Sequence, residues 1–336
     1  MILVTGGTGL VGSHLLYELT LKNQAIKATY RTKESLMAVK RVFSYFTKNV
    51  DELFEKIQWI QADITDVPSL EDAFKDVTLV YHAAALVSFN PKEYRAMRQV
   101  NIEGTANIVN YCIANKVIKL CFVSSIATID NAINKKEVTE ENEWNPETSN
   151  SCYAITKHGA EMEVWRASQE GVDVVIVNPG VILGAGFWNI NTGQLFSKIA
   201  KGFSFYTEGV TGFVGVSDVA KAMITLTEQP IKNERFILVS ENKSFKAIFT
   251  LIAKALGKKP PSIKVSKFFS SALRIFDGWI SFITQKKRLI TKESEKSMHS
   301  KTYYSSEKIK QMTDFKFEPI EQVVKETGTN YRKDKN

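Results

Sequence analysis

The stretch VTGGTGLVG, at residues 4–12, limits the fold of this chain more than any other part of its sequence. It contains four glycines, and a short apolar run lies directly before it. After it, apolar residues recur at the spacing of a helix from Leu10 to Leu19. Because glycine accepts positive φ and lets the backbone bend sharply, the pattern predicts a strand, a tight turn and a helix.

A turn of this kind suits the binding of a phosphate group. It points backbone N–H groups and the positive end of a helix dipole toward one place. Gly7, Gly9 and Gly12 fit the dinucleotide fingerprint, in which the first glycines admit the pyrophosphate and the last lets helix and strand pack closely. A purely structural turn is the alternative. We expect a dinucleotide to contact the following residues of the turn: Gly6, Thr8, Gly9, Leu10 and Val11.

Strand and helix patterns alternate through the first half of the chain. Apolar runs predict strands at 2–5, 25–30, 57–62, 79–83, 119–124 and 172–178, and helical spacing predicts helices at 35–46, 68–74, 91–115 and 153–170. This alternation predicts an α/β fold with a Rossmann-type doubly wound parallel sheet. Ligands of such sheets bind beyond the carboxyl ends of the strands.

The texture of the sequence changes after Pro179, where GVILGAGFWNINTG is rich in Gly and Asn. We therefore expect two parts. Residues 1–180 form a nucleotide-binding Rossmann domain, and residues 181–336 form mainly a smaller C-terminal substrate-binding lobe, with about 211–230 returning to the first part.

Composition and charge narrow the class of protein further. The net charge of the 336 residues is +8. In the segment at 284–336, which is also basic, acids lie among the bases, and this favours a solvated surface over a nucleic-acid-binding one. Cys112, Cys121 and Cys152 form no paired motif, which favours a reducing compartment and suggests neither disulfides nor a metal site. The first apolar stretch is too short for a secretory signal. We expect a cytoplasmic protein with no metal and no nucleic-acid partner.

The residue after the second predicted strand indicates the cofactor. An acidic residue there binds the ribose 2′-hydroxyl of NAD, whereas an arginine accommodates the 2′-phosphate of NADP. Here Arg31 follows the strand in ATYRTKES, and within this segment no acidic residue comes before Glu34. NADP(H) is therefore favoured, and NAD(H) is the alternative. Arg31 as a plain surface cation is the other reading. Asp63, after the third strand, could bind the adenine amino group or could cap a turn.

The segment YAITK places Tyr153 and Lys157 one turn apart on a helix. A nearby ammonium favours the phenolate, so we expect it to lower the pKa of Tyr153 and make the phenol a general acid for a carbonyl oxygen or a base for an alcohol. Ser125, at the end of the strand in LCFVSSIAT, could orient the same oxygen. A surface pair on an amphipathic helix and a serine that caps a strand are the alternatives.

Together these motifs resemble the extended short-chain dehydrogenase/reductase family. The resemblance covers nearly the whole chain and includes TGGTGLVG, ADITD, YHAAA, VNIEGTANIV, VSS, YAITK, NPGVILG and FVGVSDVA in that order. It implies a Ser–Tyr–Lys active site at Ser125, Tyr153 and Lys157, with Lys157 also binding the nicotinamide ribose. It implies that Asn101 supports a proton relay. The cofactor contacts that it implies, besides Tyr153 and Lys157, are Asp63, Ile64, Ala83, Ala84, Ala85, Pro179, Val181 and Ile182. A homodimer through the helices that begin near Pro91 and Tyr153 is also implied.

Within this family the chain looks most similar to the dihydroflavonol-reductase and 3β-hydroxysteroid-dehydrogenase-like branch, on the evidence of ATYR and of the segment at 289–322. The resemblance implies an NADP(H)-dependent oxidoreductase that reduces a ketone or aldehyde to an alcohol, or runs the reverse reaction. A nucleotide-sugar epimerase with tightly bound NAD is the second reading, and a non-catalytic NADP-binding redox sensor is the third. An apolar or aromatic substrate is expected. The candidates to line it, each of which could instead belong to the core, are Ser88, Phe89, Phe187, Trp188 and Phe205.

The segment at 268–283 has an apolar helical face flanked by basic residues. It is too short to span a bilayer. Contact with a membrane surface is one reading. We favour the other, in which the segment packs on the substrate lobe, because most amphipathic helices cover a core.

Overall fold

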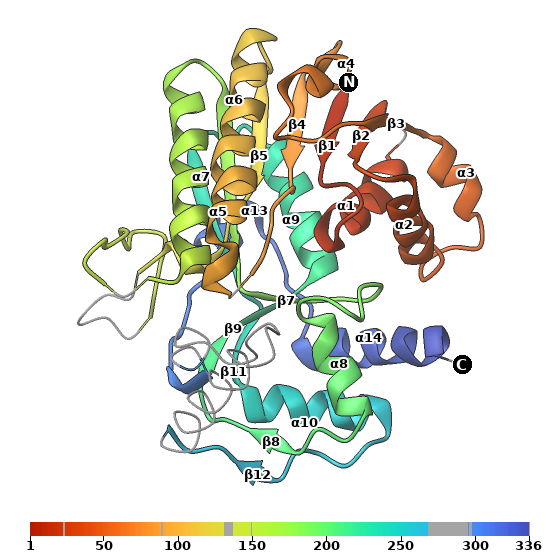
Figure 1. The fold of residues 1–336 in the computed structure, drawn as a ribbon, viewed down its shortest axis with the longest axis vertical. Helices are drawn as coiled ribbons and strands as arrows, with labels where there is room; N and C mark the ends of the chain where they lie inside the picture. The colour runs from red at the N-terminus through yellow and green to blue at the C-terminus, as the bar shows by residue number, and fades with distance from the viewer. Residues whose placement is uncertain are drawn as a thin grey trace.

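In the computed structural model, the larger lobe of the molecule is a seven-stranded parallel sheet with helices on both faces (Figure 1). The structure describes residues 1–22, 24–88, 90–130, 137–148, 150–267, 295 and 298–335. The strand order is β10-β6-β5-β4-β1-β2-β3. The order reverses on either side of β1, as in a doubly wound sheet, so the predicted Rossmann-type fold is confirmed.

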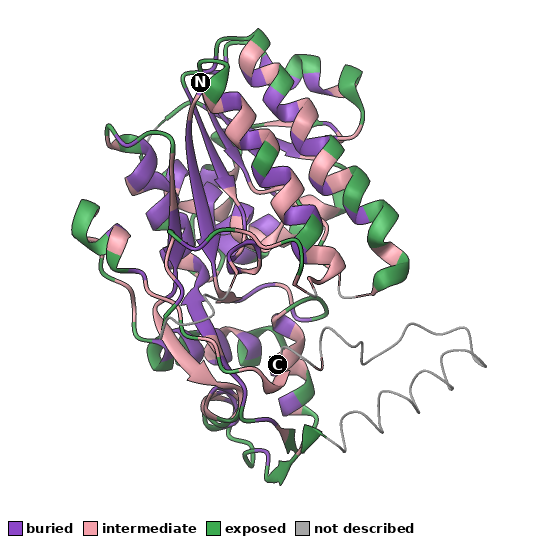
Figure 2. Ribbon diagram, turned by 90° about the vertical axis from the view of Figure 1, so that its left-hand side faces the viewer, coloured by how far each residue is buried: buried purple, intermediate pink, exposed green. Residues whose placement is uncertain are grey.

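The strands of this sheet are short and mostly buried, because helices cover both faces (Figure 2). Six of them match predicted strands to within one or two residues, and the seventh, β10, was not predicted. Their bounds are β1 (Ile2–Thr5), β2 (Ile26–Tyr30), β3 (Ile57–Gln61), β4 (Leu79–His82), β5 (Lys119–Val123), β6 (Asp173–Pro179) and β10 (Glu234–Leu238).

Two groups of helices enclose the sheet, each with its own apolar cluster. One face packs against α1 (Leu10–Thr20), α2 (Leu36–Phe43), α3 (Val50–Glu55) and α9 (Val216–Glu228). The other packs against α4 (Glu71–Phe74), α6 (Gly104–Ala114) and α7 (Cys152–Gln169). Short helical turns join these elements: η1 (Lys33–Ser35), η2 (Val67–Leu70), η3 (Pro91–Glu93) and η5 (Ile126–Thr128).

The helix predicted at 91–115 is divided. It consists of η3, α5 (Tyr94–Arg98), a π-helical turn η4 (Gln99–Glu103) and α6. A π-turn holds one residue more than an α-helical turn, and such turns occur frequently at functional sites. This one carries Asn101.

The smaller lobe has two short sheets and a third apolar cluster (Figure 1). One sheet has β7 (Val181–Leu183), β9 (Val210–Gly215) and β11 (Glu241–Ser244), and the other has β8 (Phe205–Tyr206) and β12 (Ile263–Lys264). Its helices are α8 (Gly193–Ala200), α10 (Phe245–Leu256) and α14 (Ile320–Lys335), whereas α13 (Glu307–Thr313) packs on β10.

Trp188 belongs to the core of this smaller lobe. Its ring packs against Phe196 and Tyr331, and its indole N–H donates to Asp334 at 2.7 Å. Of the two readings that the sequence leaves open for Trp188, a residue lining the substrate or a core residue, the structure supports the second, because its apolar surface is already buried.

The segment at 268–283 and Phe89 lie outside the described residues. Among the helices that the structure describes, none combines the length and apolarity that crossing a bilayer requires.

Candidate active site

The glycine turn joins β1 to α1 by close backbone contacts. Gly6 has φ +70°, and a Cβ there would lie 2.5 Å from the backbone nitrogen of Ala84. A Cβ on Gly12 would overlap the carbonyl oxygen of Gly6. Only glycine fits either position, so the turn is pressed between the loop after β4 and the first turn of α1.

The N-terminus of α1 is open toward this turn. Gly9 precedes the helix, and its N–H donates to the Gly6 carbonyl at 3.0 Å. No side chain caps the helix, and its first turn holds no acidic residue. The N–H groups of Leu10 and Val11 therefore lack a side-chain acceptor, which suits a pyrophosphate. A Cβ on Gly9 would meet only the Gly6 oxygen, at 3.4 Å, so this side of the turn has space for a ligand. These features fit a dinucleotide.

Arg31 and Asp63 follow the neighbouring strands β2 and β3. Arg31 is exposed. The carboxylate of Asp63 accepts hydrogen bonds from the N–H and the hydroxyl of Thr65, at 2.9 and 2.8 Å, through one oxygen. That oxygen closes a turn, as the alternative reading of Asp63 expected. Ile64 is buried against Gly104, and its carbonyl accepts from Asn107 at 2.9 Å.

Ser125, Tyr153 and Lys157 lie together at the carboxyl edge of β5. Ser125 begins η5, where its hydroxyl accepts from the N–H of Ala127 at 3.1 Å. The hydroxyls of Ser125 and Tyr153 are hydrogen bonded to each other. Lys157 donates to the carbonyl of Val123 at 2.7 Å and lies over the Phe122 ring, 4.2 Å from its centroid. The structure thus brings the three predicted residues to one place.

Burial controls the acid–base properties of this group. Desolvation raises the pKa of the Tyr153 phenol to about 12, while its hydrogen bond with Ser125 acts in the opposite direction. Desolvation lowers the pKa of Lys157 to about 7, against the attraction of Glu161. The expectation of a lowered phenol pKa is therefore wrong for this arrangement, because desolvation is the largest influence on the phenol.

Asn101 anchors the loop that follows β4. Its amide oxygen accepts from the N–H of Leu86 at 2.7 Å, and its amide nitrogen donates to the carbonyl of the same residue at 3.0 Å. The nitrogen also donates to the Thr156 hydroxyl, on α7 between Tyr153 and Lys157, at 3.1 Å. Asn101 thus links the loop containing Ala83, Ala84 and Ala85 to the helix that carries the phenol.

The predicted residues after β6 lie beside the same edge of the sheet. Pro179 ends β6, and Val181 and Ile182 begin β7, which pairs with β9. The carbonyl of Ile182 accepts from the Thr192 hydroxyl at 2.6 Å. This contact holds the loop after β7 against the start of α8.

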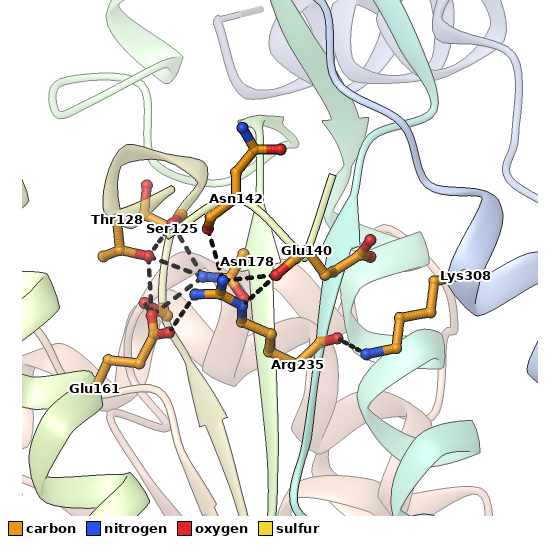
Figure 3. Close-up of polar contacts among 9 residues, drawn as sticks. Ser125, Thr128, Glu140, Asn142, Glu161, Asn178, Arg235 and Lys308 are labelled. Carbon is orange, nitrogen blue, oxygen red and sulfur yellow. Dashed lines mark hydrogen bonds and ion pairs between the residues drawn. The ribbon is translucent and has the colours of Figure 1, made fainter. Parts of the chain in front are cut away.

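A buried polar cluster next to Ser125 was missed by the sequence analysis (Figure 3). At its centre the carboxylate of Glu161 is fully buried and contacts Asn178 and Arg235. Glu161 follows Lys157 by four residues, so helical spacing could have placed it on the face of Tyr153 and Lys157. Asn178 lies in the motif NPGVILG. No local signal marks Arg235.

The open helix N-terminus at β1 and the Ser–Tyr–Lys group at β5 occur on one edge of a doubly wound sheet. Together they define the class of Rossmann-fold enzymes that use a nicotinamide dinucleotide. The chain belongs to the NAD dependent epimerase/dehydratase family, whose family model matches residues 2–238. It is an NAD(P)-dependent oxidoreductase of the extended short-chain dehydrogenase/reductase type.

Known proteins resemble the chain over most of its length. Tetraketide alpha-pyrone reductase 2 of Arabidopsis thaliana is 28% identical over 279 residues, which cover 79% of this chain and 85% of that protein. Cinnamoyl-CoA reductase 1 of Petunia hybrida is 24% identical over 321 residues, covering 90% and 92%. The crystal structure of gox2253 superposes with a TM-score of 0.82 at 24% identity, covering 99% and 98% of the two chains, and shows that the fold is shared.

Proposed function

We propose that this chain reduces the carbonyl group of a small apolar or aromatic ketone or aldehyde with NADPH, and that Ser125, Tyr153 and Lys157 carry the chemistry. One observation carries the proposal. The hydrogen-bonded pair of Ser125 and Tyr153 lies at the end of β5, and the glycine turn lies at the end of β1. Only β4 separates these strands, so the two sites are about 10 Å apart, within the span of a dinucleotide.

The hydroxyls of Ser125 and Tyr153 both donate to the substrate oxygen in this mechanism. They stabilise the negative charge that develops on it. The bound nicotinamide supplies the hydride. Tyr153 then gives its proton to the oxygen and regains one from solvent, and the raised pKa keeps the phenol in the protonated form that a reduction needs. The ammonium of Lys157 stabilises the phenolate that remains.

NADP rather than NAD is the cofactor that we propose. Arg31 is exposed directly after β2, where a guanidinium can pair with a 2′-phosphate. Gly6, Thr8, Gly9, Leu10 and Val11 would hold the pyrophosphate, while the other predicted contacts, from Asp63 to Ile182, would line the adenosine and nicotinamide ends.

We infer a division of labour along the chain. Residues 1–180, with about 211–230, would bind the nucleotide, and the rest of 181–336 would provide most of the substrate wall. The relatives named above are reductases of a pyrone and of a cinnamoyl thioester by their names, which supports an aromatic or apolar substrate.

A cytoplasmic homodimer is the form that we propose for the protein. Tyr94, Ile155 and Met162 on α5 and α7 keep 37, 39 and 44% of their surface exposed, an apolar face that a second copy could cover. Cys112 and Cys121 are buried free thiols, which fits a reducing compartment.

A panel of aromatic and aliphatic carbonyl compounds with NADPH tests the proposal, with the loss of cofactor absorbance as the signal. We expect turnover of at least one aromatic member, faster with NADPH than with NADH. Purified protein that retains NAD and turns over no carbonyl compound would instead favour a sugar-nucleotide epimerase.

A further inference from the structure

The carboxylate of Glu161 lies in the protein interior, yet it does not contact the reacting groups directly. One of its oxygens accepts hydrogen bonds from the hydroxyls of Ser124 and Thr128, at 2.6 and 2.8 Å, and from the amide nitrogen of Asn178, at 3.2 Å. Ser124 and Thr128 are the two ends of the turn that carries Ser125. The carboxylate therefore holds this turn from both sides.

Asn178 strengthens the same attachment. Its amide nitrogen also donates to the carbonyl of Ser125 at 3.1 Å and to the hydroxyl of Thr128 at 3.0 Å. Asn178 is itself fully buried, in β6. The backbone of Ser125 is thus fixed to the central sheet by a residue that Glu161 in turn binds.

The other oxygen of Glu161 faces Arg235, whose guanidinium lies 3.5 Å away. Arg235 is in β10, and it donates to the backbone carbonyls of Glu140 and Asn142 at 2.6–2.9 Å. Lys308 donates to the carbonyl of Arg235 at 3.0 Å (Figure 3). The cluster therefore joins α7, the turn of Ser125, the edge strand β10 and the segment at 137–142.

A buried ion pair of this kind is weak evidence of stabilisation, because desolvation of two charges costs several kcal/mol. Its geometry specifies position instead. Glu161 is two turns along α7 from Tyr153, so a contact between Glu161 and the Ser125 turn sets the distance between the two hydroxyls that bind the substrate oxygen.

The charge of Glu161 also acts on Lys157. It opposes the desolvation that lowers the pKa of this ammonium. Four other titratable groups lie around the pair: Tyr153 and His158 on the same helix, His82 on β4, and Arg235 on β10. Burial lowers the pKa of His82 to about 3, so that ring is neutral near pH 7. Within one turn of Lys157 on α7, Glu161 is the one acidic residue.

We propose that Glu161 is a positioning residue of the active site, which holds the Ser125 turn in register with Tyr153 and keeps a negative charge beside Lys157. The proposal rests on the carbonyl-reductase function proposed above. A loss of this contact displaces Ser125 and weakens the charge that supports the phenolate.

Glu161→Gln is the direct test, because it keeps the shape of the side chain and removes its charge. We expect kcat to fall by about a hundredfold with KM for NADPH within about twofold, since small displacements of positioned groups cost this much. We also expect the high-pH limb of the kcat profile to move to lower pH by about one unit, because Lys157 loses its acidic neighbour.

Glu163→Gln is the matched control. Glu163 lies on the same helix and pairs with Arg166 near the surface at 2.9 Å. We expect its kcat and pH profile to equal those of the unmodified protein. Thr128→Val, which removes a hydrogen bond to Glu161 and keeps the charge, should lower kcat without moving the pH limb, and Thr128→Ser should restore it.

Hydrogen exchange gives a second readout that does not depend on turnover. The N–H groups of Thr128 and Ile129 close the turn on the carbonyls of Ser125 and Ile126. In Glu161→Gln we expect these N–H groups to exchange at least about tenfold faster than in Glu163→Gln. The positioning role would be overturned if the two variants had equal exchange rates, equal kcat values and the same pH limb. Full activity in Tyr153→Phe would instead overturn the reductase mechanism itself, and the exchange result would still decide the role of Glu161.

Discussion

The glycine turn and the cluster around Glu161 both lie at the carboxyl edge of the central sheet, but they are built differently. The turn is made by the backbone of nine consecutive residues, with Gly6 and Gly12 in contact with each other. The cluster is made by side chains that are far apart in the sequence: Ser124 and Glu161 are separated by 37 residues, and Glu161 and Arg235 by 74.

This difference has physical consequences. Sterics admit almost no substitution at Gly6 and Gly12, so a change at either position affects folding and nucleotide binding. When a cluster held by hydrogen bonds loses one member, the protein can stay folded, so a substitution in the cluster affects the rate of the reaction. The following experiments test whether the two regions separate in this way.

Tyr153→Phe should have the largest effect. The variant keeps the ring and loses the proton donor, so we expect kcat to fall by about a hundred- to ten-thousand-fold. Nucleotide affinity, followed by NADPH fluorescence, should stay within about twofold, because the glycine turn is intact. A variant that keeps more than about a tenth of the activity would contradict the role of the phenol.

Gly12→Ala should disturb folding instead. Its Cβ would overlap the Gly6 carbonyl, so we expect the free energy of unfolding to fall by about 3 kcal/mol in urea denaturation. Gly9→Ala is the control, because its Cβ has only one neighbour, at 3.4 Å. It should be as stable as the unmodified protein and should bind NADPH more weakly. Equal stability of both variants would remove the steric argument for the turn.

The pH dependence of reduction should report the charge of Lys157, which is beside Glu161 of the cluster. The pKa of Lys157 is about 7, well below the ordinary value of 10.5, so the ammonium is present at low pH and is lost as the pH rises through about 7. We expect kcat to be constant near pH 6 and to decrease above pH 7, where Tyr153 is still protonated. Lys157→Arg should lack this decrease, since a guanidinium stays charged. A flat profile from pH 6 to about 9 in the unmodified protein would argue against a charged Lys157 in catalysis.

Arg31→Asp should alter cofactor choice alone. Loss of one charge-assisted contact to the 2′-phosphate should weaken NADPH binding by about tenfold or more, and the new carboxylate should improve binding of NADH. Lys33→Ala, which removes a cation from the neighbouring turn η1, is the control and should change the NADPH-to-NADH ratio little. An unchanged ratio in Arg31→Asp would make Arg31 a plain surface cation.

Six strands of the central sheet were predictable because each is a short apolar run bounded by turn residues. The strand β10 was missed because its sequence, ERFIL, begins with two charged residues, and Arg235 uses its charge inside the protein. The interruption at η4 was missed because one additional residue in a turn leaves the apolar pattern of a helix almost unchanged.

The site was predictable to the extent that its spacing is local. Tyr153 and Lys157 are four residues apart, and Ser125 follows a recognisable strand, so the sequence predicted these residues and the structure brings them together. The direction of the pKa shift of Tyr153 was not predictable, because it depends on burial by segments distant in sequence. Asn178 and Arg235 were not predictable for the same reason.

The π-turn at Gln99–Glu103 ties the length of one helix to the shape of a distant loop. Deletion of a single residue there would let α5 and α6 continue as one regular helix with little change in their relative orientation, because the π-turn absorbs that one residue. The widened turn that presents Asn101 would be lost, so its amide would no longer reach both Leu86 and Thr156, two contacts that it now makes at once. Insertions and deletions in this helix should therefore be inherited together with changes at residues 83–88, and grafting either segment alone into a related enzyme should leave the loop without its anchor.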